Sequence, residues 1–180
     1  MQEKYRPSKE EYYLNIAREV ARRSTCMSAK FGAIIVRDDQ IVATGYNGAP
    51  RKVRDCYEIG ICLRRKLGIP SGQRYEICRS VHSEQNAIIN AARAGVSILG
   101  GDMYIFGYRL IEGKEVVVTA LPCFICKKMI INAGLRRVIC SREEGGYKIY
   151  LVEDWVKEWR EKDMLEEMEQ YGIDYYKKIK

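Results

Sequence analysis

The chain has 180 residues, of which 47% are hydrophobic and 31% charged, and its formal net charge is +7 at pH 7. This length and composition predict one globular domain over residues 1–180 with its own core. No stretch is apolar enough for a membrane span or a signal peptide, so we expect a cytoplasmic protein without a membrane partner. The positive charge suits anionic partners such as nucleotides or RNA, but the basic residues are scattered, as on a solvated surface.

Hydrophobic periodicity and turn residues predict helices that alternate with strands. In chain order we expect a helix over 8–23, strands over 31–36 and 40–46 with a turn at 38–39, a long loop over 47–79, a helix over 82–94, strands over 103–108 and 115–119, a helix over 123–133, a strand over 137–140, an amphipathic helix whose apolar residues run from 152 to 168, and a possible last strand over 172–176. Ser8 is suited to cap the first helix, and Gly95 and Gly134 are placed to end two others. This alternation predicts an α/β sandwich with helices on both faces of one sheet.

Two short motifs carry the residues most suited to metal chemistry. The first is His82-Ser83-Glu84, and the second is Pro122-Cys123-Phe124-Ile125-Cys126. One imidazole and two thiolates form a typical zinc ligand set that leaves one coordination position open. Glu84 lies too close in sequence to His82 to be a comfortable fourth ligand, so we expect it beside the open position, where it can carry protons.

Each motif taken alone has a weaker explanation. An H-x-E triplet occurs by chance in many proteins, and a C-x-x-C segment could be a redox pair. The order of the two motifs and the proline before Cys123 favour the metal site. His82 is the only histidine in the chain and no G-x-S-x-G segment is present, which argues against a nucleophilic Ser-His or Cys-His dyad.

On these motifs the chain resembles the cytidine/deoxycytidylate deaminase superfamily, whose signature is H-x-E followed by P-C-x-x-C. Further segments resemble its deoxycytidylate branch; they are 23–26, 32–33, Gly45-Tyr46-Asn47-Gly48, 84–88 and 131–134. The resemblance implies a cytidine-deaminase-like three-layer α/β/α sandwich around a mixed, roughly five-stranded sheet. It also implies that the two motifs lie at the N-termini of neighbouring helices, and that the protein is a homo-oligomer, either a dimer or a hexamer.

The resemblance assigns the reacting groups. His82, Cys123 and Cys126 would hold a catalytic zinc ion that activates water for attack at C4 of a cytosine. Glu84 would be the catalytic residue that takes the water proton, delivers it to the ring nitrogen and helps ammonia to leave. A surface carboxylate in a first helical turn is the alternative for Glu84, and the neighbouring ligands argue against it.

Three residues are expected to bind the substrate. By resemblance Asn47 would bind the sugar of the nucleotide, although an Asn-Gly turn without function is the alternative. Ser83 stands where alanine is usual in the family and could add a hydrogen bond. Tyr147 follows the strand at 137–140 and is a candidate phosphate contact. The segment over 106–120 is longer than in typical members and could reshape this pocket.

Four further cysteines are expected to bind a second, structural zinc; they are Cys26, Cys56, Cys62 and Cys78. Three of them lie in the long loop, which has few apolar residues to hold it, and Cys26 precedes the strand that leads back to that loop. Some deoxycytidylate deaminases carry an additional zinc in this region, so the resemblance agrees. Unpaired buried thiols or a redox-sensitive disulfide are the alternatives.

The sequence therefore predicts a zinc-dependent hydrolytic deaminase that acts on a small-molecule cytosine nucleotide, with dCMP converted to dUMP and ammonia. One alternative is a deaminase that acts on a base in RNA such as tRNA, but the chain has no long basic arm. Another alternative is a zinc-stabilised binding module without catalysis, which would not require Glu84.

Overall fold

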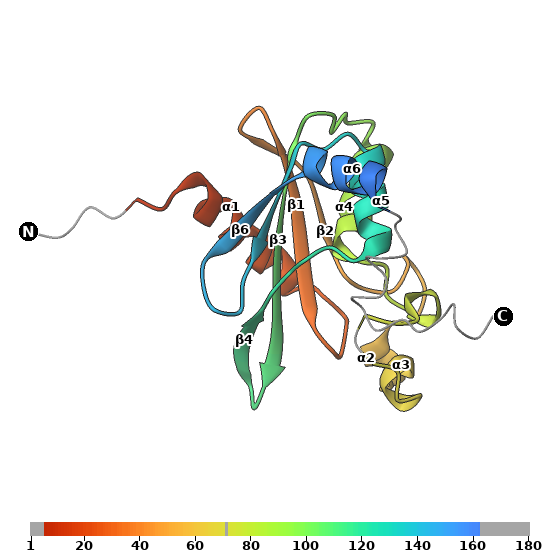
Figure 1. Cartoon of the computed structure of the whole chain (residues 1–180). Coiled ribbons are helices and arrows are strands. Elements are labelled where there is room, and N and C mark those ends of the chain that lie inside the picture. The colour runs from red at the N-terminus through yellow and green to blue at the C-terminus, as the bar shows by residue number, and fades with distance from the viewer. Residues whose placement is uncertain (1–5, 71, 163–180) are drawn as a thin grey trace, which may run out of the picture.

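The computed structural model describes residues 6–70 and 72–162. The described elements are α1 (Lys9–Ala21), β1 (Lys30–Arg37), β2 (Gln40–Tyr46), α2 (Cys56–Ile59), α3 (Leu63–Lys66), the 3₁₀ turn η1 (Tyr75–Ile77), α4 (Ser83–Ala94), β3 (Asp102–Ile111), β4 (Lys114–Val118), α5 (Phe124–Asn132), β5 (Arg137–Ser141), β6 (Tyr147–Leu151) and α6 (Val152–Glu161) (Figure 1). Among these residues, no helix is both long and apolar enough to cross a membrane.

The strands form a mixed sheet. In the order β2-β1-β3-β5-β6, neighbouring strands are antiparallel except β3 and β5, which are parallel. The sixth strand, β4, pairs only with the far half of β3, from Gly107 to Ile111, and forms a hairpin with it. The predicted mixed, roughly five-stranded sheet is confirmed, and the long segment over 106–120 proves to be this additional hairpin.

Local signals placed the first elements correctly. Ser8 caps α1 and forms a reciprocal capping box with Glu11. Asp38 and Asp39 connect β1 and β2 with φ angles of 52° and 62°, the left-handed conformation that a two-residue hairpin turn requires. Gly95 ends α4 in the same conformation, with a φ angle of 68°.

Two regions differ from the prediction. The expected loop over 47–79 contains the short helices α2 and α3 and the turn η1. The strand β6 was not predicted, because only one edge of it is paired, with β5, and three of its five residues are exposed. The last part of the predicted amphipathic helix, from 163 to 168, and the possible strand over 172–176 lie outside the described residues.

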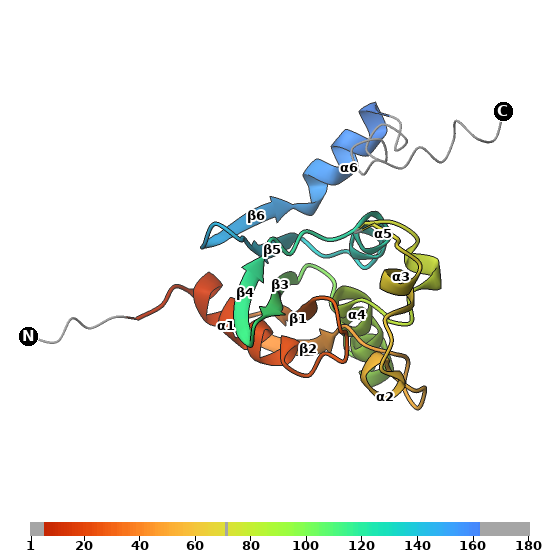
Figure 2. The same cartoon turned by 90° about the horizontal axis from the view of Figure 1, so that it is seen from below.

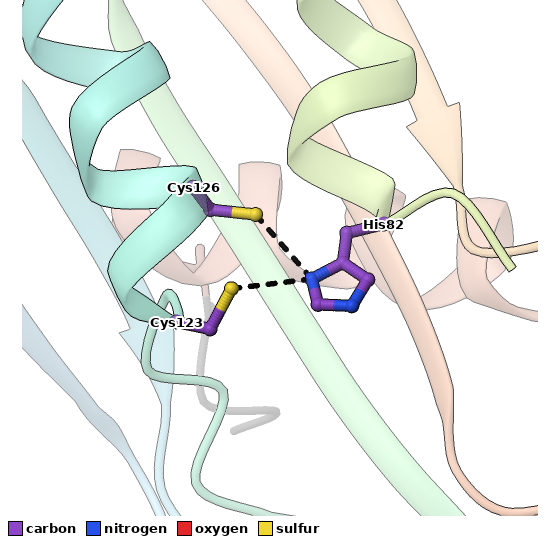
Figure 3. Close-up of side chains that lie close together, drawn as sticks. All are labelled: His82, Cys123 and Cys126. Atoms are coloured by element: carbon purple, nitrogen blue, oxygen red, sulfur yellow. Dashed lines mark hydrogen bonds between the residues drawn. The ribbon is translucent and has the colours of Figure 1, made fainter. Parts of the chain in front are cut away.

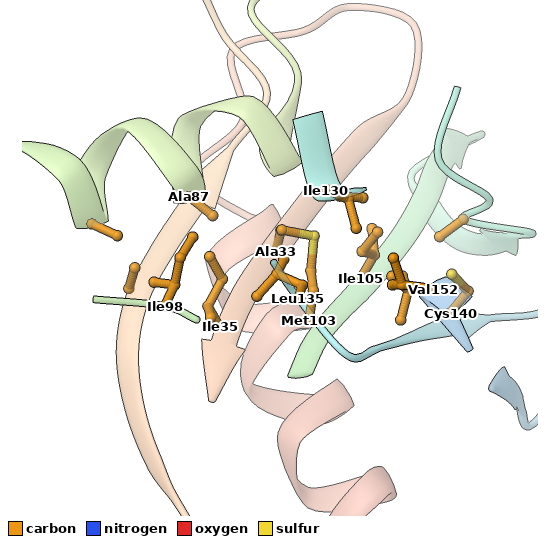
Figure 4. Packing of buried hydrophobic residues seen from close by; sticks show 14 of the residues in the cluster. Ala33, Ile35, Ala87, Ile98, Met103, Ile105, Ile130, Leu135, Cys140 and Val152 are labelled. Atoms are coloured by element: carbon orange, nitrogen blue, oxygen red, sulfur yellow. The ribbon is translucent and has the colours of Figure 1, made fainter. Parts of the chain in front are cut away.

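Helices cover both faces of the sheet, as predicted. On one face α1 packs Tyr13, Leu14 and Ala17 against the strands. On the other face the main core lies between the strands and helices α4, α5 and α6, where residues such as Ala87, Met103, Ile105 and Ile130 are almost completely buried (Figures 2 and 4). The described residues therefore form an α/β/α sandwich.

Close contact between β2 and α4 fixes the position of the first motif. A methyl group built on Gly45 would lie 2.3 Å from the backbone nitrogen of Ala87 and 2.4 Å from the carbonyl oxygen of Ser83. Only glycine therefore permits this approach of the strand to the helix. Asn86 and Asn90 of the same helix donate hydrogen bonds to backbone oxygens of β2, so the beginning of α4 is held firmly on the sheet.

Candidate active site

The two sequence motifs meet at the N-termini of adjacent helices, as predicted. His82 is the N-cap residue of α4, Cys123 is the N-cap residue of α5, and Cys126 lies in the first turn of α5. The Nδ1 atom of His82 lies 3.4 Å from Sγ of Cys123 and 3.4 Å from Sγ of Cys126. Figure 3 shows the three side chains pointing toward one another from the two helices.

The donor set fits a zinc ion. Its three donor atoms all lie within 4.8 Å of one another. Tetrahedral zinc with Zn–N and Zn–S bonds of about 2.0 and 2.3 Å would separate nitrogen and sulfur by about 3.5 Å, which agrees with the two measured distances of 3.4 Å. Three protein ligands leave the fourth position open, which is typical of catalytic rather than structural zinc.

The electrostatics of the site also favour a cation. Hydrogen bonding with Cys126 and with His82 lowers the pKa of the Cys123 thiol to about 4, although burial opposes this shift. Cys126 retains the proton of the pair, and its pKa is raised by the hydrogen bond to Cys123 and by burial. A metal ion can displace that proton, because zinc binds thiolates and the N-termini of both helices stabilise negative charge.

Glu84 lies beside the ligands and is almost completely buried, with 6% of its surface exposed. Ser83 Oγ donates a hydrogen bond of 2.8 Å to Oε2 of Glu84, and Ser83 itself is fully buried. The side chain of Gln85 accepts a hydrogen bond from the backbone N–H of His82. The first turn of α4 thus holds the backbone of His82 and the carboxylate of Glu84 in place.

A cavity of about 140 Å³ opens onto these groups. Its lining includes four of the residues predicted for the reaction and for substrate binding, His82, Glu84, Cys123 and Asn47. A buried carboxylate and metal ligands at the base of a concave site are the usual components of a hydrolytic centre.

Of the three expected substrate contacts, only Asn47 is among the lining residues of the cavity. Asn47 Oδ1 accepts hydrogen bonds from Ser24 Oγ and the Phe31 N–H, and its Nδ2 donates to the Ala29 carbonyl, so the side chain anchors the loop and keeps one N–H unassigned. Ser83 hydrogen bonds to Glu84 and is not among the lining residues. Tyr147 lies on β6, packs against the core on the α1 face, and does not line the cavity either.

The sulfur atoms of the four cysteines predicted to bind a second zinc, Cys26, Cys56, Cys62 and Cys78, do not lie as close together as the donor atoms of the His82 group. Among the described residues, the His82 group is the one set of three or more potential metal ligands whose atoms lie within 4.8 Å of one another. Burial raises the pKa of the Cys56 thiol, and the electrostatic influence of Cys26 and Cys62 raises it further, which places both of these cysteines near Cys56. Cys26 and Cys78 line the same cavity.

Sequence patterns missed three residues of the cavity wall, namely Arg64, Tyr75 and Arg109. The Tyr75 ring meets the His82 ring edge to face, with 4.7 Å between their centroids, and the Arg64 guanidinium lies 4.7 Å from the Tyr75 centroid. No local motif marks these residues, because Arg64 and Tyr75 belong to short helical turns in the segment that was expected to be a loop.

Comparison with known proteins agrees with this geometry. A family model described as the cytidine and deoxycytidylate deaminase zinc-binding region matches residues 7–142. The deoxycytidylate deaminase of Mycobacterium phage D29 is 34% identical over 143 residues, which cover 77% of this chain and 98% of the phage protein. That of Schizosaccharomyces pombe is 31% identical over 136 residues, which cover 76% of this chain but 38% of the yeast protein. The chain thus spans less than half of that yeast relative.

A solved structure has a similar fold. The dCMP deaminase of cyanophage S-TIM5 in apo form is 26% identical, with a TM-score of 0.51 over 74% of this chain and 82% of the phage chain. A second crystal structure of that phage enzyme is in complex with dCMP and dUMP. The family model spans both ligand motifs, and the match to the D29 protein covers nearly all of that phage protein. This chain therefore belongs to the cytidine and deoxycytidylate deaminase family.

Proposed function

We propose that the protein catalyses the hydrolytic deamination of dCMP, in which dCMP and water become dUMP and ammonia. The observation that carries this proposal is the buried carboxylate of Glu84 beside three converging zinc ligands at the base of a cavity. The similarity to a phage enzyme that was solved with dCMP and dUMP supports the choice of substrate, as does the similarity to the D29 deoxycytidylate deaminase.

Each group in the site then has a defined task. Zinc, when bound by His82, Cys123 and Cys126, supplies the Lewis acidity that lowers the pKa of water toward about 7. Glu84 takes the proton from that water, transfers it to the ring nitrogen of the cytosine, and assists departure of the amino group as ammonia. Its burial keeps the carboxylate away from bulk water while it carries the proton.

Other residues hold these groups in position. Ser83 orients the Glu84 carboxylate through the 2.8 Å hydrogen bond, and Tyr75 packs edge to face against the His82 ring. For Asn47 we propose that the remaining Nδ2 hydrogen contacts the sugar, since the other side-chain hydrogen bonds already fix this group at the cavity wall.

For Cys26, Cys56, Cys62 and Cys78 we propose a structural zinc that draws together the segment between β2 and α4. The proximity of Cys26 and Cys62 to Cys56 supports this proposal. A metal that closes a long loop removes much of its conformational freedom. A homo-oligomeric assembly, a cytoplasmic location, and contact of Tyr147 with the substrate stay predictions from the sequence.

A panel of substrates tests the proposed activity. Zinc-loaded protein is incubated with dCMP, deoxycytidine, CMP, dCTP, AMP and a tRNA, and the release of ammonia is measured. We expect the highest kcat/KM for dCMP. Preferred turnover of the tRNA would favour the RNA-editing alternative, and no ammonia from any cytosine or adenine compound would indicate a binding module without catalysis.

A further inference from the structure

The cavity is strongly asymmetric in charge. Its base holds Glu84, which is the only carboxylate among its described lining residues, whereas two guanidinium groups, those of Arg64 and Arg109, lie in its wall. Within the described part of the chain neither arginine forms an ion pair with a carboxylate. Two cations without an ion-pair partner in the wall of a small cavity favour an anionic ligand.

Arg64 has an unused hydrogen-bond donor. Its Nη2 donates to the Pro70 carbonyl at 2.7 Å, and its guanidinium lies 4.7 Å from the centroid of the Tyr75 ring. Its Nε–H is buried and has no hydrogen-bond partner. A buried hydrogen-bond donor without an acceptor is unfavourable. A bound ligand or a water molecule can supply the acceptor that such a group lacks.

Arg109 supplies the second cation from another part of the fold. It lies on β3 where β4 pairs with it, and it lines both this cavity and an adjoining one of about 260 Å³. The adjoining cavity shares Ser28 with the first and is also lined by Lys30 and Arg65. Arg109 therefore adds positive charge at the place where the two cavities meet.

We infer that Arg64, with Arg109, binds the 5′-phosphate of the nucleotide substrate and makes the enzyme prefer nucleoside monophosphates over nucleosides. This inference rests on the proposed deaminase function. A guanidinium presents its N–H groups in a planar array that suits phosphate oxygens, and the buried Nε–H of Arg64 would gain the acceptor that it lacks. The Tyr75 ring holds the guanidinium in position and also contacts the His82 ring, so the phosphate contact and the metal ligand share one support.

The test compares matched compounds with and without the phosphate. For zinc-loaded wild-type, Arg64→Gln, Arg64→Lys and Lys66→Gln proteins, kcat/KM is measured for dCMP and for deoxycytidine, and Kd for dUMP and for deoxyuridine. Lys66→Gln is the control because Lys66 is an exposed cation on the same short helix. Zinc content and the melting temperature establish that each variant is folded and loaded.

We expect Arg64→Gln to lower kcat/KM for dCMP and to weaken dUMP binding by about 10- to 100-fold, the range for hydrogen bonds to a charged group. Values for deoxycytidine and deoxyuridine should not change, Arg64→Lys should retain part of the preference, and Lys66→Gln should match wild type. An equal loss for compounds with and without phosphate, or no loss for either, would overturn the inference. Failure of the proposed function is distinguishable, because wild-type protein would then release no ammonia from dCMP.

Discussion

The cavity is built from two regions that are held in different ways. On one side, α4 and α5 rest on the sheet, and their own residues Ala87, Ala91 and Ile130 are completely or almost completely buried against it. On the other side, the segment between β2 and α4 contains only short helical turns, and its apolar residues Tyr57, Leu63 and Leu67 are exposed. In Figures 1 and 2, α2 and α3 project from the sheet on the side of α4.

This difference separates chemistry from recognition. The three proposed zinc-binding residues and Glu84 belong to the packed region. There they lie at the N-termini of two helices that are packed on the sheet. Arg64, Tyr75 and Cys78 come from the less packed segment. Metal binding or substrate binding can supply the order that hydrophobic burial does not provide there. We therefore expect substitutions in the first region to affect the reaction, zinc binding at the His82 site and global stability. Substitutions in the second region should affect the proposed structural zinc and the specificity for substrate.

The largest effect is expected from Glu84→Gln. Glutamine has almost the same shape but cannot carry the proton, so kcat should fall about 100- to 10,000-fold, whereas the zinc content should stay the same. Glu153→Gln is a suitable control, since Glu153 is an exposed carboxylate in the first turn of another helix. The measurements are ammonia release and metal analysis. Wild-type turnover in the Glu84 variant would contradict the assigned role.

Adding a methyl group at a glycine should have different effects on the free energy of unfolding in the two regions. Gly45→Ala places a methyl group against the backbone of α4, and overpacking of this kind typically costs about 1–3 kcal/mol. Because the clash is relieved by moving the beginning of α4, the affinity for zinc should decrease as well. Thermal unfolding and zinc titration measure both effects.

Gly68→Ala is the matched substitution in the less packed segment. Nothing lies within 4 Å of the added methyl group, so only the strain of its positive φ angle of 65° applies. Its affinity for zinc at the His82 site should be that of wild type. If Gly45→Ala and Gly68→Ala changed zinc affinity equally, the two regions would not be held in different ways.

The smallest effect on global unfolding is expected from the double substitution Cys56→Ser and Cys78→Ser. We expect metal analysis of wild-type protein to give close to two zinc ions per chain and that of the variant close to one. Because the loss is local, proteolysis should increase between residues 50 and 80 while the melting temperature changes little. Cys140→Ser is the control, since Cys140 is a buried core thiol on β5. One zinc per chain in metal-replete wild-type protein would contradict the second site.

Short-range sequence signals determined much of this protein. Residues that control the backbone locally, such as Ser8 at a helix start and Asp38-Asp39 in a turn, gave the order of the elements. The convergence of His82, Cys123 and Cys126 was also predictable, because zinc requires particular donor atoms, and His82 and Cys123 each stand at the N-cap of a helix that packs on the sheet. Chemistry and local structure coincide in these motifs, so a single sequence is sufficient to identify them.

Tertiary structure decided the residues that carry no local signal. β6 becomes a strand because β5 offers an unpaired edge, and β4 adds to β3 beyond the reach of β5. Arg64, Tyr75 and Arg109 line one cavity although they belong to segments far apart in sequence. The physical reason is that side-chain contacts across the fold depend on how separate elements pack together, which neighbouring residues in the chain do not encode.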